Sequence, residues 1–410
     1  MIRICLPTLL WHRPVFAVLT MLLIPLYGCH QEQGADAPAR LKMAHVYEVK
    51  APTHLYGTAH LAERLQQVTG DLDVTVYPAA QLGSEAELLE QLVAGELDLA
   101  ISGPSFLAMW HPPLGVLDAA FASRDLDHML EIARGNEMAP HWDEIRRKYD
   151  VRVLDTWAYG ARHITSNIPI RHPDDLDGFR LRMPGASVWQ ASGAALGASP
   201  MPISFAEVYL ALQQGIADGQ ENPVPVIKAK GFHEVQTCLN LTGHIQSSIQ
   251  ILMNERVWQR LETDQQELLL KVVQNLGQEV YRGIVSDERR LIEEWRSEGT
   301  MQIVENVDVD AFRRRARKFF SSGYAFSDLY NRITADPVPD DAATNPSPVP
   351  DAEAAGQRSN QASMDVRTPG NTNELLTIPV AACFSSETAK GDSHHNGRTV
   401  SIASSGDKHP

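Results

Sequence analysis

The sequence predicts an α/β fold with two lobes that face each other across a cleft. Residues 72–77, 84–95 and 97–101 follow one another as strand, helix and strand, the order typical of a parallel sheet with helices on its faces. Residues 204–223 repeat the helix–strand part of this unit with the same spacing. An apolar helical pattern over 264–298 predicts one helix of roughly 50 Å, long enough to brace both lobes.

The first unit opens with a strand and a helix. Residues 41–46 are predicted as a short strand, and an apolar stripe predicts a helix over 53–68. Leu72, Val74 and Val76 then alternate with more polar residues, which is typical of a half-buried strand. The helical stripe consists of Leu55, Ala59, Ala62 and Leu65.

Equivalent residues define the repeat. Each copy begins with a capping box, in which a serine and a glutamate three residues later satisfy free N–H groups at a helix start. A glycine follows eleven residues after the serine, an aspartate comes three residues later, and a strand then leads to a proline. The pairs are Ser84 and Ser204, Gly95 and Gly215, Asp98 and Asp218, and Pro104 and Pro223. The equal spacing of the serines, glycines and aspartates, with a proline after each strand, predicts two lobes built on one plan.

Two strands are expected to connect the lobes. Residues 151–157 would cross to the second lobe, and residues 247–253 would return. Residues 159–167 are interpreted as a short helix or loop. The long helix carries one apolar stripe, and Gly277 and Gly283 are expected to bend it. The stripe consists of Leu269, Val273, Leu276, Val280, Ile284, Leu291 and Trp295.

A strand that ends before Pro184 carries two arginines, Arg180 and Arg182, on one face. At a strand end, a guanidinium group can grip a carboxylate with two parallel charge-assisted hydrogen bonds. The alternative is a surface arginine paired with an aspartate that precedes the strand. Those aspartates are Asp174, Asp175 and Asp177.

The stretch 159–223 resembles the substrate-binding proteins of tripartite ATP-independent periplasmic (TRAP) transporters, the DctP-like family. The resemblance covers about residues 41–333 and is carried by segments in a fixed order and spacing. The core segments are Tyr159–Asn167, Leu176–Pro184 and Asp218–Pro223, and the others are Tyr77–Gly83, Gly95–Asp98, Pro202–Tyr209 and Phe232–Gln236.

This resemblance implies a two-lobed periplasmic solute-binding fold with crossing hinge strands and a long bracing helix. Lobe I is expected to comprise residues 41–159 and 248–287, and lobe II residues 160–247 and 288–336. It also implies capture of a small organic acid between the lobes and its delivery to the small and large membrane subunits of a permease. A sugar acid such as a uronate or an aldonate is the favoured ligand, and a C4-dicarboxylate is second.

The resemblance further implies which residues hold the ligand. Arg182 matches an arginine that clamps the carboxylate, Arg162 matches a second arginine that faces the ligand, and Asn222 matches a ligand-facing asparagine. Phe205 matches an aromatic residue that covers the ligand, although a core role is the alternative. Glu85 matches a position that contacts polar ligand groups in some members.

Three further side chains have two interpretations each, and a fourth has one. His163 could donate a hydrogen bond to a ligand hydroxyl or be a satisfied neighbour of the preceding arginine. Trp110 and Trp189 could stack on the ligand or belong to the core, and Glu221 is interpreted as structural.

Two positions depart from the sialic acid binders of the family. Gly103 replaces an acidic residue that faces the ligand, and Gly185 replaces an asparagine. The sequence therefore lacks groups that suit a large amino sugar acid, while it keeps the arginine clamp.

Composition and motifs narrow the functional class. The 410-residue chain has a formal net charge of −15, which argues against nucleic acid or an anionic membrane surface as partner. No GxSxG, HExxH, P-loop or strand-placed GxGxxG motif is present, so neither an enzyme nor a cofactor is predicted. No Cys/His spacing indicates a metal, and Cys238 is interpreted as a core residue. A receptor-docked sensory module and a sugar-acid enzyme remain the alternatives.

Both chain ends differ from this central region. Residues 1–28 are predicted to be a signal peptide, because their apolar run is too short to span roughly 30 Å of hydrocarbon. Leu26–Cys29 resembles a bacterial lipobox, although Tyr27 is bulkier than usual. Cys29 is therefore predicted to be lipidated and to anchor a periplasmic protein to the inner or outer membrane. Residues 337–410 are rich in Pro, Ala, Ser, Asn, Asp and Gly and are predicted to be disordered.

Overall fold

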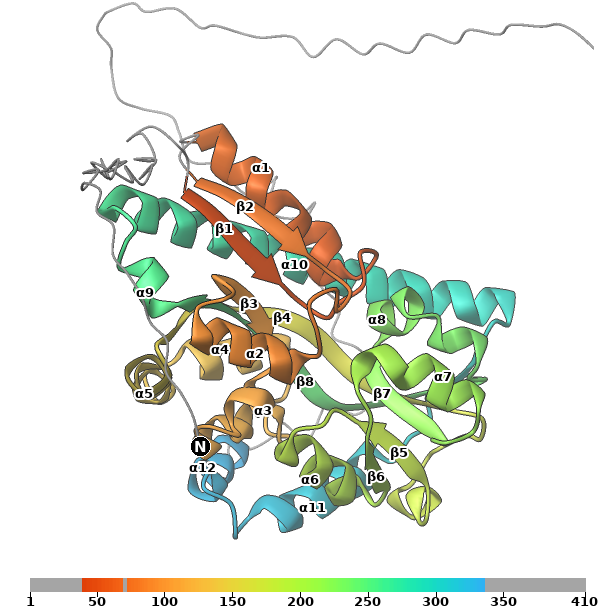
Figure 1. Ribbon diagram of the computed structural model, residues 1–410. Coiled ribbons are helices and arrows are strands. Elements are labelled where there is room, and N and C mark those ends of the chain that lie inside the picture. Colours follow the sequence, from red (N-terminus) through yellow and green to blue (C-terminus); the bar gives the residue numbers. More distant parts are fainter. Residues whose placement is uncertain (1–38, 69–71, 336–410) are drawn as a thin grey trace, which may run out of the picture. The chain divides into compact units, whose positions relative to one another are not determined.

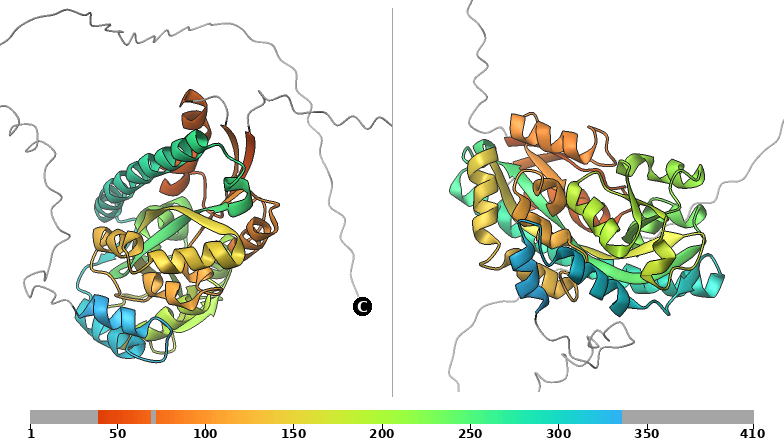
Figure 2. Two further views of the ribbon diagram at one scale, coloured as in Figure 1. Left: turned by 90° about the vertical axis from the view of Figure 1, so that its left-hand side faces the viewer. Right: turned by 90° about the horizontal axis from the view of Figure 1, so that it is seen from below.

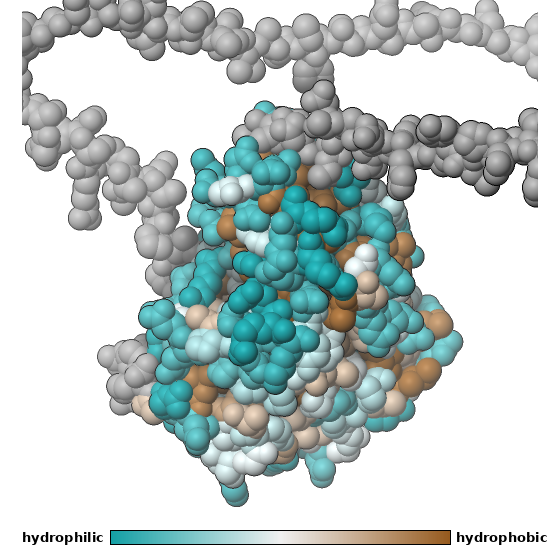
Figure 3. All heavy atoms as spheres, turned by 60° about the vertical axis from the view of Figure 1, so that its left-hand side comes forward, coloured by the Kyte–Doolittle hydropathy of each residue, from teal (hydrophilic) through white to brown (hydrophobic). Residues whose placement is uncertain are grey.

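The computed structural model describes residues 39–68 and 72–335 (Figure 1). The predicted signal peptide at 1–28, the lipidation site Cys29 and the predicted tail at 337–410 lie outside these residues. In the part of the chain that is described, no helix is both long and apolar enough to cross a membrane. Hydrophilic residues predominate on the face drawn in Figure 3.

The described strands form one nine-stranded sheet in the order β2-β1-β3-β8-β4-β7-β5-β6, with β9 paired to β8. The order is symmetric, because β1 lies between its parallel neighbours β2 and β3 just as β5 lies between β6 and β7. We call β1–β3 with their helices the first half and β5–β7 with theirs the second half. The strands are β1 (Ala39–Ala44), β2 (Leu72–Tyr77), β3 (Leu99–Ser102), β4 (Val151–Ser166), β5 (Arg180–Met183), β6 (Ser199–Pro202), β7 (Gly219–Pro223), β8 (Cys238–Asn254) and β9 (Gln302–Val304). The predicted fold class, with two halves built on one plan, is confirmed.

Helices pack around both halves, and the long α10 lies along one face of the sheet (Figures 1 and 2). Short π- or 3-10-helical segments carry η labels. In chain order the segments are η1 (Thr53–Thr58), α1 (Ala59–Val68), α2 (Glu85–Ala94), α3 (Pro104–Leu107), η2 (Pro112–Asp118), α4 (Leu126–Arg134), α5 (Ala139–Tyr149), η3 (Pro173–Leu176), α6 (Ser187–Leu196), η4 (Phe205–Glu207), α7 (Val208–Gln213), α8 (Val224–Ala229), η5 (Phe232–Glu234), α9 (Glu255–Trp258), α10 (Thr263–Glu298), α11 (Val309–Phe320) and α12 (Ser327–Thr334).

The repeated aspartates have the same role in the two halves. A carboxylate oxygen of Asp98 accepts the backbone N–H of Lys42 in β1 at 2.7 Å. A carboxylate oxygen of Asp218 accepts the backbone N–H of Arg180 in β5 at 2.8 Å. Each aspartate thus ties the strand that follows a helix to the first strand of its own half.

The two predicted capping boxes differ. Ser84 and Glu87 form one at the start of α2, and Gly95 ends that helix in the left-handed conformation with φ 79°. Ser204 does not cap α7 in this way, so the second prediction is wrong. The intervening 3-10 segment η4 brings the N–H of Glu207 to the carbonyl of Ser204, and the serine hydroxyl donates to the Glu207 carboxylate instead.

The first predicted helix begins with the π-helical segment η1. A π turn holds more residues than an α turn, so it rotates the residues that follow relative to the core. Leu61 and Leu65 are fully buried, whereas Leu55 is 43% exposed and Ala59 is exposed. The prediction that Leu55 and Ala59 face the core is therefore wrong.

β4 is longer than the predicted crossing strand. It runs for 16 residues to Ser166, so the interpretation of 159–167 as a short helix or loop is wrong. β8 pairs along one side of β4, and β7 pairs with its final residues on the other. Hydrogen-bonding partners on both sides favour a strand over a locally bonded helix. β8 is also longer than predicted, and Cys238 at its start is buried, as expected.

The 36-residue helix α10 confirms the predicted brace. At 1.5 Å per residue it extends about 54 Å. It contacts η1 and α1 of the first half, β4 at the centre, and α8 of the second half. Every residue of its predicted apolar stripe is buried. A Cβ at Gly277 would lie 2.6 Å from Trp157 and one at Gly283 would lie 2.1 Å from Tyr56, so these glycines allow two aromatic rings to pack against the helix.

Candidate functional site at the junction of the two halves

The register of the sheet directs the carboxyl ends of β3 and β7 toward each other. β3 ends at Ser102, which is level, through β8, with Thr156 of β4. β7 runs in the opposite direction and ends at Pro223, level with Arg162 of β4. Residues 157–161 of β4 therefore lie between two strand ends that point at one another. Ligands of open α/β sheets bind outside the carboxyl ends of the strands, so this junction is the candidate site.

Polar and aromatic side chains from both halves meet at this junction. Phe205 and Glu85 are half-buried, and the other members are buried. The ring of Tyr47, from the loop after β1, lies 5.1 Å from the Tyr159 ring and 6.3 Å from the Phe205 ring, which joins the two halves. We call this set the junction cluster: Tyr47, Glu85, Asp118, Tyr159, Arg162, Arg182, Trp189, Phe205, Glu221 and Asn222.

Arg162 is the most heavily bonded member of the junction cluster. Its guanidinium donates from Nε and Nη2 to the two carboxylate oxygens of Glu221, and Nη2 also donates to Oδ1 of Asn222 at 3.1 Å. The indole of Trp189 lies 4.4 Å below the guanidinium carbon. Burial opposes the ionisation of Glu221, but the Arg162 charge and hydrogen bonds outweigh it and hold the pKa of Glu221 below its ordinary value. The charge of Arg162 is thus compensated within the protein.

Arg182 is equally buried but has no such compensation. It is 2% exposed, and its Nε and Nη2 donate to the carbonyl oxygen of Ile203 at 2.9 and 2.7 Å. No carboxylate of the described residues lies within ion-pair distance of it, and Arg180 is the arginine of β5 that pairs with Asp218. Burial lowers the pKa of Arg182 to about 10, so the group is charged at neutral pH. The alternative of a surface arginine paired with a nearby aspartate is wrong.

Asn222 and Phe205 surround the two arginines. The side-chain amide of Asn222 donates to Oε1 of Gln220 at 2.6 Å, while its oxygen accepts from Arg162, so its orientation is defined at both ends. The Phe205 ring lies 5.9 Å from the Arg182 guanidinium carbon and 5.0 Å from Nζ of Lys230. The Phe205 ring therefore lies close to both cationic groups, Arg182 and Lys230.

Two carboxylates lie on the first-half side of the junction. Oε1 of Glu85 accepts from the backbone N–H of Gly103 at 2.6 Å and from the Ser102 hydroxyl at 2.8 Å. Oδ2 of Asp118 accepts from the backbone N–H and the hydroxyl of Ser105 at 2.9 and 2.7 Å. Burial raises the pKa of Glu85 and raises that of Asp118 to about 7, in spite of these hydrogen bonds.

The structure does not bring His163 into the junction cluster. Successive residues of a strand point to opposite faces, and His163 points away from Arg162 toward α10. Its Nδ1 accepts the N–H of Gly243 at 3.0 Å, and Nε2 lies 3.6 Å from a carboxylate oxygen of Glu288. Trp110 is likewise elsewhere, stacked on Tyr149 at 4.8 Å.

The sequence interpretation missed three members of the junction cluster. Asp118 is the only charged residue in the apolar segment 114–122, a pattern that could have identified a buried carboxylate. Tyr47 and Tyr159 carried no such signal, because tyrosine is common both in cores and at sites. In the described ranges, no group of three or more His, Cys, Asp or Glu residues is arranged to hold a metal ion.

A family model described as bacterial extracellular solute-binding protein, family 7 (DctP), matches residues 43–325 of the chain. The chain is 34% identical over 261 residues to the sialic acid-binding periplasmic protein SiaP of Vibrio cholerae. The alignment covers 63% of this chain and 81% of that protein.

The fold is similar to solved structures of TRAP periplasmic solute-binding proteins. One, from Roseobacter denitrificans with bound L-galactonate, has a TM-score of 0.68 at 31% identity and covers 73% of this chain and 99% of that one. Another, from Sulfurospirillum deleyianum with bound succinate, has a TM-score of 0.66 at 27% identity, with the same two coverages.

Proposed function

Because the chain belongs to family 7 of the bacterial extracellular solute-binding proteins, the TRAP solute-binding proteins, we propose that it captures a small organic acid at the junction of its two halves. It then delivers this ligand to the small and large membrane subunits of a TRAP permease. A sugar acid such as a uronate or an aldonate is the favoured ligand, and a C4-dicarboxylate is second. The L-galactonate and succinate bound by the two similar structures support these two classes.

The observation that carries the proposal is the uncompensated charge of Arg182. A buried cation is costly unless it is paired. Of the five N–H groups of its guanidinium, two are engaged by Ile203. The three that remain are on Nη1 and Nη2 and suffice for an end-on fork of two hydrogen bonds to a ligand carboxylate. The charges of Glu221 and Glu85 act on Arg182 only without direct contact, so the ligand would supply the bonded carboxylate that the described residues do not provide.

Arg162 and Asn222 have a different role in this proposal. Glu221 neutralises Arg162, so the role of this arginine is to hold the Asn222 amide in place beside the ligand. Phe205 covers the clamp. Closure of the lobes, with hinges near residues 159–160 and 247–248, would exclude water and strengthen the ion pair to Arg182.

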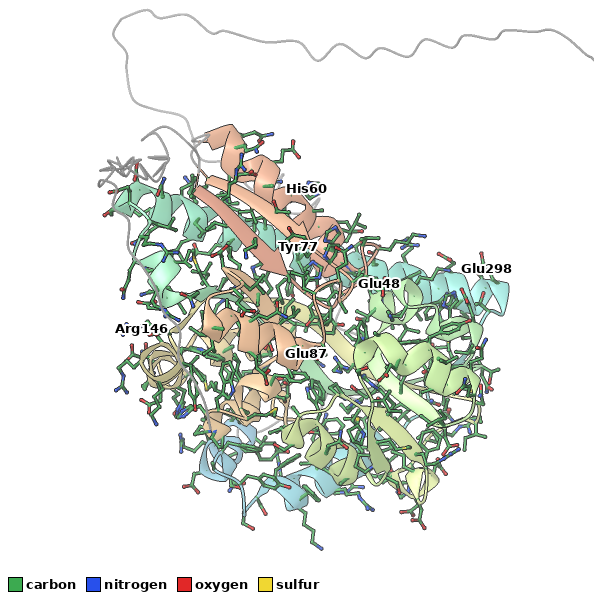
Figure 4. All side chains as sticks on the ribbon, viewed as in Figure 1. Glu48, His60, Tyr77, Glu87, Arg146 and Glu298 are labelled. Atoms are coloured by element: carbon green, nitrogen blue, oxygen red, sulfur yellow. The ribbon has the colours of Figure 1, made fainter. Side chains whose placement is uncertain are left out.

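An ion pair between the halves supports such a closure. Nζ of Lys230, at the end of α8, lies 2.8 Å from Oε1 of Glu48 in the loop after β1. Figure 4 shows Glu48 beside α8. The same ammonium group lies over the Phe205 ring that covers Arg182. We refer to Glu48–Lys230 as the latch, because it joins the two halves directly beside the proposed clamp.

We expect Lys230→Met to raise the ligand dissociation rate about fivefold, because a partly exposed ion pair contributes on the order of 1 kcal/mol to the closed state. Stopped-flow displacement of bound ligand measures this rate. Lys228→Met is the matched control, since Lys228 lies on the same helix and faces Glu294 of α10 at 3.8 Å. Equal dissociation rates for both variants would contradict the latch.

The proposed location is the periplasm. Periplasmic relatives support it, and the lipobox-like Leu26–Cys29 supports a lipid anchor on Cys29. In this arrangement the anchor would keep the protein near its permease.

A melting-temperature screen of the purified protein tests the proposed function. L-Galactonate, D-galacturonate and succinate are offered, with the uncharged methyl ester of D-galacturonate as matched control. A ligand at 100 times its Kd stabilises the fold by about 2.7 kcal/mol, which raises the melting temperature measurably. Stabilisation by at least one acid but not by the ester is expected. No stabilisation by any carboxylate, or equal stabilisation by the ester, would contradict the proposal.

A further inference from the structure

We propose that Glu85 and Asp118 form an acidic wall that accepts hydrogen bonds from the ligand's hydroxyl groups and rejects a second carboxylate. The inference rests on the proposed function. It assigns to this chain a polyhydroxylated monocarboxylate rather than a C4-dicarboxylate, and it makes Asp118 a specificity-determining residue.

The geometry around Gly103 places both carboxylates at the edge that faces the second half. Gly103 directly follows β3, whose carboxyl end points toward that of β7. A Cβ added at Gly103 would lie 3.7 Å from Oε1 of Glu85 and 3.8 Å from Oδ2 of Asp118. The two acidic side chains therefore flank Gly103, and this residue places no side chain of its own between them.

Each carboxylate bonds the protein through one oxygen and leaves the other without a donor. Glu85 uses Oε1 for the Gly103 N–H and the Ser102 hydroxyl, and no donor among the described residues contacts Oε2. Asp118 is 0% exposed, so water does not reach its Oδ1, and this oxygen has no hydrogen-bond partner among the described residues. Holding the start of α3 requires only one oxygen from each residue. A buried acceptor without a donor is costly, and a ligand hydroxyl would satisfy it.

The charges of the two sides are opposite. The second half contributes the uncompensated Arg182, whereas the first half contributes Glu85 and Asp118. Arg162 acts electrostatically on both acids and Arg182 acts on Glu85, so the groups share one site. A ligand with a carboxylate at one end and hydroxyl donors at the other matches this polarity. The second carboxylate of succinate would meet like charge.

Burial raises the pKa of Asp118 to about 7, so the test is made at about pH 8.5, where this carboxyl group is ionised. Isothermal titration of the wild-type protein with L-galactonate and with succinate at this pH tests the inference. We expect L-galactonate to bind more tightly. Asp118→Asn preserves an acceptor oxygen for Ser105 but removes the negative charge. It should weaken L-galactonate binding about tenfold, as loss of a hydrogen bond to a charged acceptor does, without weakening succinate binding. Glu85→Gln should likewise reduce the preference for L-galactonate over succinate, measured as the ratio of the two Kd values.

Ser105→Ala is the control for a merely structural role, because it removes one hydrogen bond to Asp118 and leaves the carboxylate in place. It should keep the wild-type ratio of the two Kd values. Tighter binding of succinate by the wild-type protein would overturn the inference. So would an unchanged ratio in both acid variants, or a shift in Ser105→Ala equal to that in Asp118→Asn. Binding of no acid at all would overturn the proposed function as well, so the two failures are distinguishable.

Discussion

Arg182→Met is expected to lower the affinity for the ligand roughly 30-fold to 4,000-fold. Loss of one partner of a buried, hydrogen-bonded charge pair costs about 2–5 kcal/mol, and each 1.4 kcal/mol is a factor of ten. Isothermal titration with the best ligand of the melting screen measures the change. Methionine is apolar and close to arginine in length, so the substitution removes the charge and leaves little empty space.

The same substitution should not destabilise the protein when no ligand is present. Burial lowers the pKa of Arg182 to about 10, below its ordinary value. A base whose pKa is lowered by folding costs stability at every pH below that folded pKa, so the cost is fully present at pH 7. The unliganded Arg182→Met variant is therefore expected to melt no lower than the wild type.

Arg180→Met is the matched control for Arg182. It removes an arginine from the same strand and the same face, but one that is exposed and paired with Asp218. Its ligand affinity should equal that of the wild type. If Arg180→Met loses affinity as Arg182→Met does, or if Arg182→Met binds normally, Arg182 is not the clamp.

Glu221→Ala is expected to lower the free energy of unfolding by about 3–5 kcal/mol. The substitution would leave the Arg162 guanidinium, which is 3% exposed, without its counter-ion. Because the pKa of Glu221 is held below its ordinary value, its contribution is fully present at neutral pH and is lost as the pH falls through the folded pKa. Urea unfolding at pH 7 measures the loss.

A double variant separates a lost ion pair from a lost side chain. Arg162→Met combined with Glu221→Leu removes both charges and replaces them with apolar groups of similar volume, a change that is often neutral. It should recover most of the stability lost in Glu221→Ala. If the free energy of unfolding of Glu221→Ala lies within about 1 kcal/mol of the wild-type value, the Arg162–Glu221 pair does not stabilise the fold.

Much of the architecture could be predicted because it is recorded in local patterns. The seven-residue stripe of α10 specifies one buried face whatever that face contacts, and it was correct throughout. Asp98 and Asp218 stand at equivalent positions of the repeat, and each accepts a backbone N–H from the first strand of its own half. The prediction failed where the same apolar pattern is compatible with more than one helix type. The predicted helix over 53–68 begins with the π-helical segment η1, and Leu55 is exposed there because the apolar pattern assumes 3.6 residues per turn.

The sequence by itself determined the two-half α/β plan and the long brace, and five of the six residues it proposed as ligand-binding are ones that the structure brings together at the junction. Only the tertiary structure decided how their charges are distributed. Arg162 and Arg182 look alike as residues in a sequence, yet Glu221 neutralises the first and no described carboxylate pairs with the second. Of the two interpretations of His163, the structure favours a residue satisfied within the protein, because neighbouring residues of a strand point to opposite faces. Asp118 enters the site from a segment far along the chain, and periodicity within one element carries no information about contacts between elements.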